Sequence, residues 1–305
     1  MIGIYEGKKK TDNANIFLED FLRDAIELEH AGLTFRGKHI TITFSDFICD
    51  APAKAFITCV KSHTGFYGCS KCTRKGVYYR TNPKRKGRVI FPQTRALRRT
   101  NLSFRNQTQI QHHKGKSCLI GLAIDMIKAI PLDPMHLLDL GVIRKLLNAW
   151  IGSNHPNVKI PAYKINELSK ILLSFAPYIP SDFARKSRSL DDLPRWKATE
   201  LLLFRKYVGP VAFKPILHED FYLNFLNFHV ATRLLSDSEL SRDKEVVNYC
   251  KTLLTNFVKD SQRLYGRQFV SHNVHNLMHI PEDVLHLGPL ESFSAYPFEN
   301  YMQII

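Results

Sequence analysis

Residues 39–72 read HITITFSDFICDAPAKAFITCVKSHTGFYGCSKC. The first part of this stretch is rich in β-branched and aromatic residues, which favour a pleated strand, and Asp50 stands where that strand would give way to Ala51-Pro52. The following AKAFITCVKSH predicts a short helix. A buried strand that ends in a carboxylate delivers an acid to one edge of a sheet, so Asp50 is a candidate catalytic residue. An aspartate at a strand end is, however, more often a turn former.

The residues before this stretch predict another strand and another helix. The chain begins with the apolar residues Ile2, Ile4 and Tyr5, and residues 13–33 place apolar side chains at helical spacing, with Gly32 to end the helix. The order strand, helix, strand, helix predicts an α/β fold with a mostly buried sheet.

Two thiols follow Asp50 in the sequence GFYGCSKC. Cys69 and Cys72 have the CxxC spacing that lets two thiolates reach one tetrahedral ion, and Gly68 relieves the tight turn before them. By itself this pair is half of a metal site.

Histidines near the other end of the chain supply the other half. Residues 272–279 read HNVHNLMH, and on a helix His275 and His279 share a face, with His272 three residues earlier on the same stripe. Two cysteines with two histidines would complete a structural zinc site. The alternative is an oxidisable surface CxxC and an unrelated histidine-rich helix face.

Composition limits the class of protein. The 305 residues are 44% hydrophobic, enough for a large core, and they contain no apolar run of membrane-spanning length and no secretory leader pattern. The six cysteines are unevenly spread, which suits a reducing compartment better than a disulfide framework. We expect a soluble protein with no membrane partner.

The net charge of +15 is concentrated in one segment. Residues 51–124 contain sixteen Lys or Arg and no Asp or Glu, which predicts a polyanionic partner, most commonly nucleic acid. The alternative is a solvated basic loop with no specific partner. The candidate nucleic-acid contacts are Arg74, Lys75, Arg80, Lys84, Arg85, Lys86, Arg88, Arg95, Arg98 and Arg99.

The middle of the chain predicts a large helical region. Residues 65–111 are a poor core former, and a long helix is expected to begin near LDPMHLL, where Asp133 can cap it and Pro134 can occupy its first turn. SAYPFENYM near the end predicts the start of one more helix. Further helices are expected at about 163–176, 196–208, 218–235 and 242–264.

Four segments together resemble a known family. They are IGIYEGKKKTDNANIFLEDFLRDAIEL, FICDAPAKAFITCVKSHTGFYGCSKCTRKG, PLDPMHLLDLGVIRKLL and NVHNLMHIPEDVLHLGPLESFSAYPFENYMQII. Their set and order resemble the catalytic region of CACTA-type (En/Spm-like) transposases, and the layout is similar to the core of Transib transposases and the V(D)J recombinase. The resemblance implies an RNase H-like (retroviral integrase-like) sheet, interrupted by a mostly helical insertion, with a D-D-E metal site and a Cys2His2 zinc.

Carried onto this sequence, the resemblance makes Asp50 the second catalytic acid and Glu299 the third, both binding Mg²⁺ or Mn²⁺. Met135-His136 matches a Met-His element of the family, for which a helix-packing histidine is the simplest interpretation. The implied ligands of a structural Zn²⁺ are Cys69, Cys72, His275 and His279.

The first catalytic aspartate of the family belongs to a segment upstream of the one that IGIYEGKKK resembles. Asp46 shares a strand face with Asp50, but four residues at ~3.3 Å each separate them by ~13 Å, whereas two catalytic metals lie ~3.5–4 Å apart. We therefore expect an N-terminally incomplete sheet and a metal site that lacks one acid.

The resulting expectation is a fragment or remnant of a nuclear DNA transposase, inactive as given, whose partners are transposon ends, target DNA and a second copy of itself. The alternatives are a transposase-derived, non-enzymatic nucleic-acid-binding protein and a zinc-stabilised helical interaction protein. The expected segments are 1–64 (RNase H-like part), 65–124 (CxxC element and basic loop), 125–290 (helical insertion) and 291–305 (start of the final RNase H-like helix).

Overall fold

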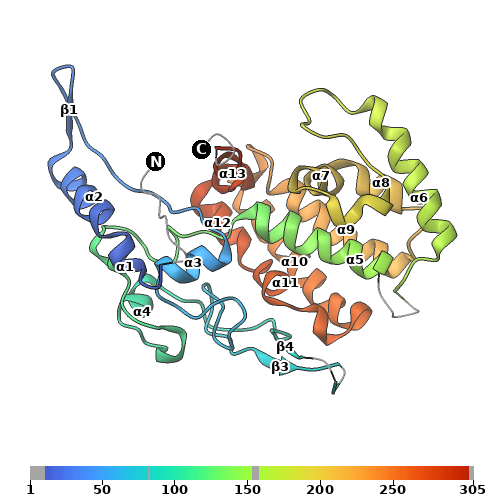
Figure 1. Ribbon diagram of the computed structural model, residues 1–305, viewed down its shortest axis with the longest axis horizontal. Helices are drawn as coiled ribbons and strands as arrows, with labels where there is room; N and C mark the ends of the chain where they lie inside the picture. Colours follow the sequence, from blue (N-terminus) through green and yellow to red (C-terminus); the bar gives the residue numbers. More distant parts are fainter. Residues whose placement is uncertain (1–10, 82, 85, 153–157, 302–305) are drawn as a thin grey trace. The chain divides into compact units, whose positions relative to one another are not determined.

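The computed structural model describes residues 11–81, 83–84, 86–152 and 158–301, and it is a mixed α/β structure with mostly helices (Figure 1). Its described strands form two antiparallel pairs, β1 (Leu33–Phe35) with β2 (Lys38–Ile40) and β3 (Val77–Tyr79) with β4 (Arg88–Ile90). The chain divides into unit 1, Met1–Gly76 with Arg95–Leu132, and unit 2, Val77–Thr94 with Asp133–Ile305.

Unit 1 contains the predicted N-terminal helix. Gly32 ends it with a φ of +64°, where a Cβ would meet the carbonyl oxygen of Ile40 at 2.6 Å, so only glycine fits. Phe104 and Leu119 lie in the apolar core of the unit. Its helices are α1 (Ala14–Phe17), α2 (Glu19–Ala31), α3 (Ala51–Ile57), α4 (Asn101–Arg105), η1 (Ile110–His112) and η2 (Cys118–Gly121).

The strand expected up to Asp50 is not formed, because β2 ends at Ile40 and residues 41–50 adopt no regular structure. Phe44 and Phe47 pack edge-on against the Phe21 ring, at 5.7 and 6.0 Å between centroids. The apolar residues that predicted a strand therefore fill a core, without the ladder of main-chain bonds that a strand needs. The first expected strand, at Ile2 to Tyr5, lies outside the described residues.

Unit 2 contains the predicted helical region. The expected helices at 163–176, 218–235 and 242–264 correspond to α6, α9 and α10, and α9 and α10 pack side by side (Figure 1). The elements are η3 (Met135–Ile143, π-helical), α5 (Arg144–Gly152), α6 (Ala162–Phe175), η4 (Ala176–Tyr178), η5 (Leu190–Arg195), α7 (Ala198–Leu203), η6 (Phe204–Val208), α8 (Gly209–Phe213), α9 (Glu219–Leu234), η7 (Leu240–Arg242), α10 (Lys244–Tyr265), η8 (Arg267–Phe269), α11 (His272–Asn276), α12 (Ile280–Leu287), η9 (Leu290–Phe293) and α13 (Tyr296–Tyr301).

Aromatic side chains fill the core of unit 2. The buried Trp150 ring packs against Phe213 and Phe225, with centroids 5.3 and 5.5 Å away, and its indole N–H donates to the Tyr265 hydroxyl at 3.2 Å. Such a ring with a satisfied polar atom stabilises a core.

None of the described helices is long and apolar enough to cross a membrane.

A buried ion pair ties three elements of unit 2 together. Arg205 Nε of η6 donates to Asp139 Oδ1 of η3 at 2.6 Å, and both side chains are almost fully buried. The Tyr296 hydroxyl of α13 lies 3.1 Å from Asp139 Oδ2 and 2.9 Å from the Ala198 carbonyl oxygen. The helix that carries Glu299 is thereby anchored to the interior of the unit.

Candidate metal centre

The two cysteines of the CxxC motif lie at a tight turn in unit 1. Cys69 and Cys72 are fully buried, with their Sγ atoms 3.5 Å apart. The Gly65 N–H donates to the Ser62 carbonyl and the Gly68 N–H to the Gly65 carbonyl, so the chain coils before the motif. A Cβ at Gly68 would lie 2.3 Å from the Ser62 oxygen, so this close approach requires glycine.

Arg99 supports this turn from the inside of unit 1. Its Nε donates to the Cys69 carbonyl oxygen at 3.1 Å, and its N–H donates to the Lys71 carbonyl oxygen. The side chain is buried, which lowers its pKa. Arg99 is therefore not an exposed candidate for a nucleic-acid contact, because its guanidinium is buried against the CxxC turn. The run of arginines in the sequence gave no signal of this.

The two histidines lie in unit 2, at a break between two short helices. His275 belongs to α11 and His279 precedes α12, so they do not share one continuous helix, yet their Nε2 atoms are 3.3 Å apart. The Phe91 ring stacks on His275 at 5.3 Å between centroids. His272, the third histidine of the stripe, lies with its ring against Phe91 and beside Asn276, and it is not part of the cluster.

Cys69, Cys72, His275 and His279 form a buried Cys2His2 cluster whose ligand atoms all lie within 4.8 Å of one another. A tetrahedral zinc with Zn–S of about 2.3 Å and Zn–N of about 2.0–2.1 Å separates two sulfurs by about 3.8 Å and two nitrogens by about 3.3 Å. The observed sulfur pair, at 3.5 Å, and nitrogen pair, at 3.3 Å, fit that geometry. The cluster can hold a metal such as zinc.

The two thiols of the cluster would need a cation to ionise. The hydrogen bond with Cys69 raises the pKa of the Cys72 thiol well above its usual value, and burial raises it further. Two neighbouring buried thiols become thiolates only when a positive charge compensates them, and a divalent metal supplies that charge.

Asp50 caps a helix. Its Oδ1 accepts a hydrogen bond from the Ala53 N–H at 2.6 Å, with Pro52 in the first turn of α3. This is the local role that the turn-former interpretation predicted, and it leaves the second carboxylate oxygen as a further acceptor.

Replacing Asp50 by alanine is expected to lower the free energy of unfolding by about 1 kcal/mol, because the cap is lost. Asp50→Asn keeps an oxygen that can cap and should change stability by only a few tenths of a kcal/mol. Chemical denaturation of both variants checks this. Equal losses in the two would contradict the capping role.

Glu299 lies in α13 of unit 2 with a largely exposed side chain. Its Oε1 is 3.9 Å from His136 Nε2, and His136 Nδ1 donates to Asp133 Oδ2 at 2.5 Å. Asp133 also accepts from the N–H groups of His136 and Ala295, so it caps the predicted helix and holds the imidazole. His136 is thus a partly exposed side chain held by a buried carboxylate three residues earlier, and only the structure shows that it lies beside Glu299 of α13.

Glu299 and His136 line a groove of about 1190 Å³ in unit 2. Five cationic side chains share its walls, and of these Arg188 and Arg195 are paired with Glu200 and Asp192. The cationic residues are Arg144, Arg185, Arg188, Arg195 and Lys197. Four of the five lie within residues 185–197, where Asp191 and Asp192 interrupt the positive charge, so this segment does not stand out in the sequence.

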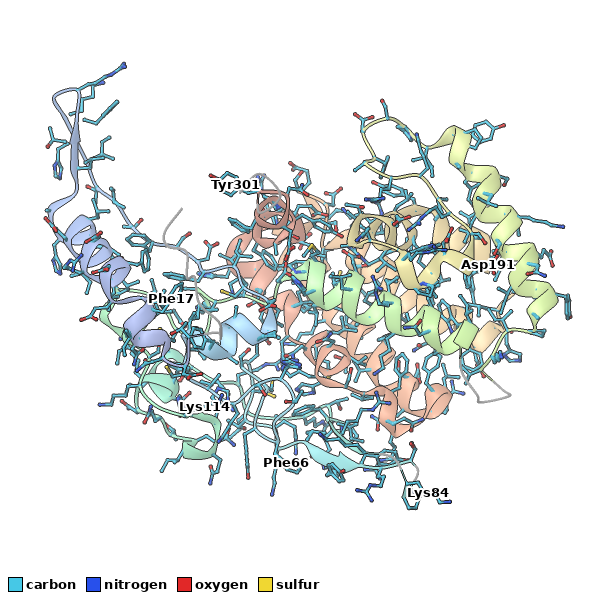
Figure 2. All side chains as sticks on the ribbon, in the orientation of Figure 1. Phe17, Phe66, Lys84, Lys114, Asp191 and Tyr301 are labelled. Carbon is cyan, nitrogen blue, oxygen red and sulfur yellow. The ribbon has the colours of Figure 1, made fainter. Side chains whose placement is uncertain are left out.

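Most of the candidate nucleic-acid contacts lie at the surface. Figure 2 shows Lys84 in the loop between β3 and β4. The exposed residues are Lys75, Arg80, Lys84, Lys86, Arg88 and Arg95. Two others, Arg74 and Arg98, are half-buried, and Arg85 lies outside the described residues.

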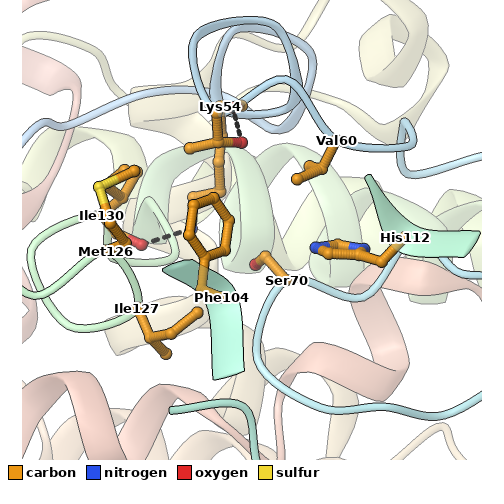
Figure 3. Close-up of a pocket in the computed structure, with 9 residues that line it drawn as sticks. Lys54, Val60, Ser70, Phe104, His112, Met126, Ile127 and Ile130 are labelled. Carbon is orange, nitrogen blue, oxygen red and sulfur yellow. Dashed lines mark hydrogen bonds between the residues drawn. The ribbon is translucent and has the colours of Figure 1, made fainter. Parts of the chain in front are cut away.

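Other cations of the basic segment are internal. Lys54 Nζ donates to the Ile130 carbonyl and Lys71 Nζ to the Ile127 carbonyl, each at 2.7 Å, and Arg105 donates to three main-chain carbonyls of unit 1. Figure 3 shows Lys54 beside a cavity of about 10 Å³. Part of the excess charge in residues 51–124 therefore stabilises unit 1 and is not available to a polyanion.

No protein-family model, no curated protein and no solved structure matches this chain. Function is therefore inferred from the residues and their geometry.

Proposed function

We propose that this chain belongs to the catalytic region of a D-D-E DNA transposase, in which a structural zinc holds the fold and basic side chains hold DNA. The Cys2His2 cluster carries the proposal. The resemblance to CACTA-type transposases selects two of six cysteines and two of thirteen histidines, and these four side chains are buried together. This agreement between the residues that the resemblance selects and the residues that the structure brings together supports both the zinc site and the family.

The RNase H-like fold with a helical insertion is part of the same proposal. Asp50 directly precedes α3, and the long helical region lies in the sequence between Cys72 and Glu299, as the family layout requires. Nuclear localisation and action as a dimer on paired DNA ends follow from the family resemblance alone.

The catalytic acids would act through divalent metal. In the complete enzyme the carboxylates of Asp50 and Glu299, with the aspartate that the family places upstream, would hold Mg²⁺ or Mn²⁺, which activates the attacking oxygen and stabilises the charge at phosphorus. Oxygen ligands of this kind suit these hard cations, and the exposed position of Glu299 beside a cationic groove suits a phosphodiester.

The basic hairpin supports DNA as the partner. β3 and β4 present exposed Arg80, Lys84 and Lys86 together with a half-exposed Tyr78, whose ring lies 6.0 Å from the Arg80 guanidinium carbon. Cations beside an aromatic ring suit a phosphate backbone and its bases.

A DNA-binding measurement tests this function. We expect the logarithm of the binding constant to fall with the logarithm of salt concentration with a slope of about −4.5, which corresponds to about five phosphate contacts. Nicking assays with Mg²⁺, made on a chain that includes the upstream segment with the first aspartate, then compare the parent with Asp50→Asn, which keeps the helix cap, and Glu299→Gln.

Nicking that both substitutions abolish supports the enzyme. Salt-dependent binding without nicking supports the second candidate, a transposase-derived non-enzymatic DNA-binding protein, which the exposed basic hairpin equally favours. Absence of salt-dependent binding would overturn both and leave a zinc-stabilised helical interaction protein.

A further inference from the structure

A second cavity in unit 2, of about 460 Å³, is lined by three cationic side chains and by no carboxylate among the described residues. Arg88 comes from β4, and Arg144 and Lys145 come from the start of α5. The other polar residues that line it are Asn148, Tyr265 and Gln268. Like charges around one cavity repel each other, so the cavity favours an anion.

Lys145 is held in this cavity at an energetic cost. Its Nζ lies 5.0 Å from the centroid of the Phe269 ring, and burial, followed by the charge of Arg88, lowers its pKa to about 7. The other charged or titratable groups that line the cavity are Arg144 on its own helix and Tyr265 on α10. An ammonium in such surroundings is stabilised when an anion enters.

Arg144 has donors to spare. One Nη2 hydrogen donates to the Trp196 carbonyl at 2.7 Å, whereas Nε is buried and has no hydrogen-bond partner among the described residues. The guanidinium carries five N–H donors, so Arg144 can bind an anion in the cavity while it keeps the contact with Trp196.

We propose that this cavity binds one phosphate group of a DNA backbone through Arg88, Arg144 and Lys145. The inference rests on the proposed DNA-binding function and specifies a contact within it. Arg88 belongs to the basic hairpin, and Arg144 also lines the groove that contains Glu299. A strand bound at the hairpin can therefore continue past this cavity toward the groove.

The first test replaces Lys145 by methionine, which keeps the aliphatic stem against Phe269 and removes the charge. The salt slope of DNA binding should become less negative by about 0.9, the value of one phosphate contact. The matched control is Lys259→Met, at an exposed position of α10, which should leave the slope unchanged. An unchanged slope in Lys145→Met would overturn the proposal.

The Lys145→Met substitution should weaken DNA binding but increase the stability of the folded protein at pH 7. Because the folded pKa of Lys145 lies near 7 and the ordinary value is 10.5, the unfolded chain holds more protons between these values, so the wild type should gain stability as pH rises from about 7 to 10. Lys145→Met should melt at a higher temperature than the wild type at pH 7 and lack this gain. A lower melting temperature would indicate a merely structural lysine.

The second test does not depend on DNA. Reductive methylation near pH 7.5, read by peptide mass spectrometry, should modify Lys145 readily, and millimolar inorganic pyrophosphate should protect it at least threefold while leaving Lys259 unprotected. If pyrophosphate protects Lys145 but the protein does not bind DNA, the anion site is real and its ligand is a free phosphate compound. The proposed DNA-binding function is then rejected. Absence of protection, with DNA binding intact, would reject the site alone.

Discussion

Replacing Cys69 by serine is expected to remove the bound metal and to lower the free energy of unfolding by roughly 5 kcal/mol, because structural zinc contributes about 10–16 kcal/mol in small zinc peptides and a hydroxyl is a poor substitute for a thiolate ligand. The ligands Cys72 and His275 are 203 positions apart in the chain (275 − 72), so a bound ion closes a very long loop. The wild type should carry about one equivalent of zinc, measured by atomic emission.

Two further variants make this test specific. Cys118→Ser alters a half-buried thiol of unit 1 that is not in the cluster and should retain the metal. His279→Ala should lose it as Cys69→Ser does, and a chelator should destabilise the wild type to a similar degree. A Cys69→Ser protein with unchanged zinc content and melting temperature would contradict the site.

Replacing Arg205 by methionine is expected to lower the free energy of unfolding by about 3–5 kcal/mol, because it leaves the carboxylate of Asp139 buried without a counter-charge. Burial already raises the pKa of Asp139, and the charge of Arg205 opposes that shift. Denaturant unfolding should show a lower midpoint with an unchanged slope.

The double variant Asp139→Leu with Arg205→Met distinguishes the charge from the packing. Two apolar side chains of similar size should recover most of the lost stability, since neither leaves a buried charge alone. Tyr296 loses one of its two hydroxyl partners in this variant and keeps the Ala198 carbonyl. If the double variant is as unstable as Arg205→Met, the large effect comes from packing and not from the unpaired carboxylate.

The helices could be predicted from the sequence because their interactions are local. Main-chain bonds in a helix join residues four apart, so apolar spacing and caps such as Asp133 and Gly32 are visible in a short window. The strand predicted before Asp50 is not formed at residues 41–50, and a short window of sequence could not show this. A strand depends on a partner chain segment, and the phenylalanines at 44 and 47 pack against Phe21 instead.

The candidate site also has features that depend on local sequence and features that depend on long-range contacts. By itself, the sequence predicted the four residues of the Cys2His2 cluster, because the CxxC and His-x3-His spacings each place two donor atoms close together along the chain. Only the tertiary structure decided that Arg99 supports the cysteine turn, that His136 lies beside Glu299, and that Arg88 shares a cavity with Lys145. The reason is that electrostatic and hydrogen-bond contacts act through space over a few ångströms, and the residues they join are separated by tens to hundreds of positions in the chain.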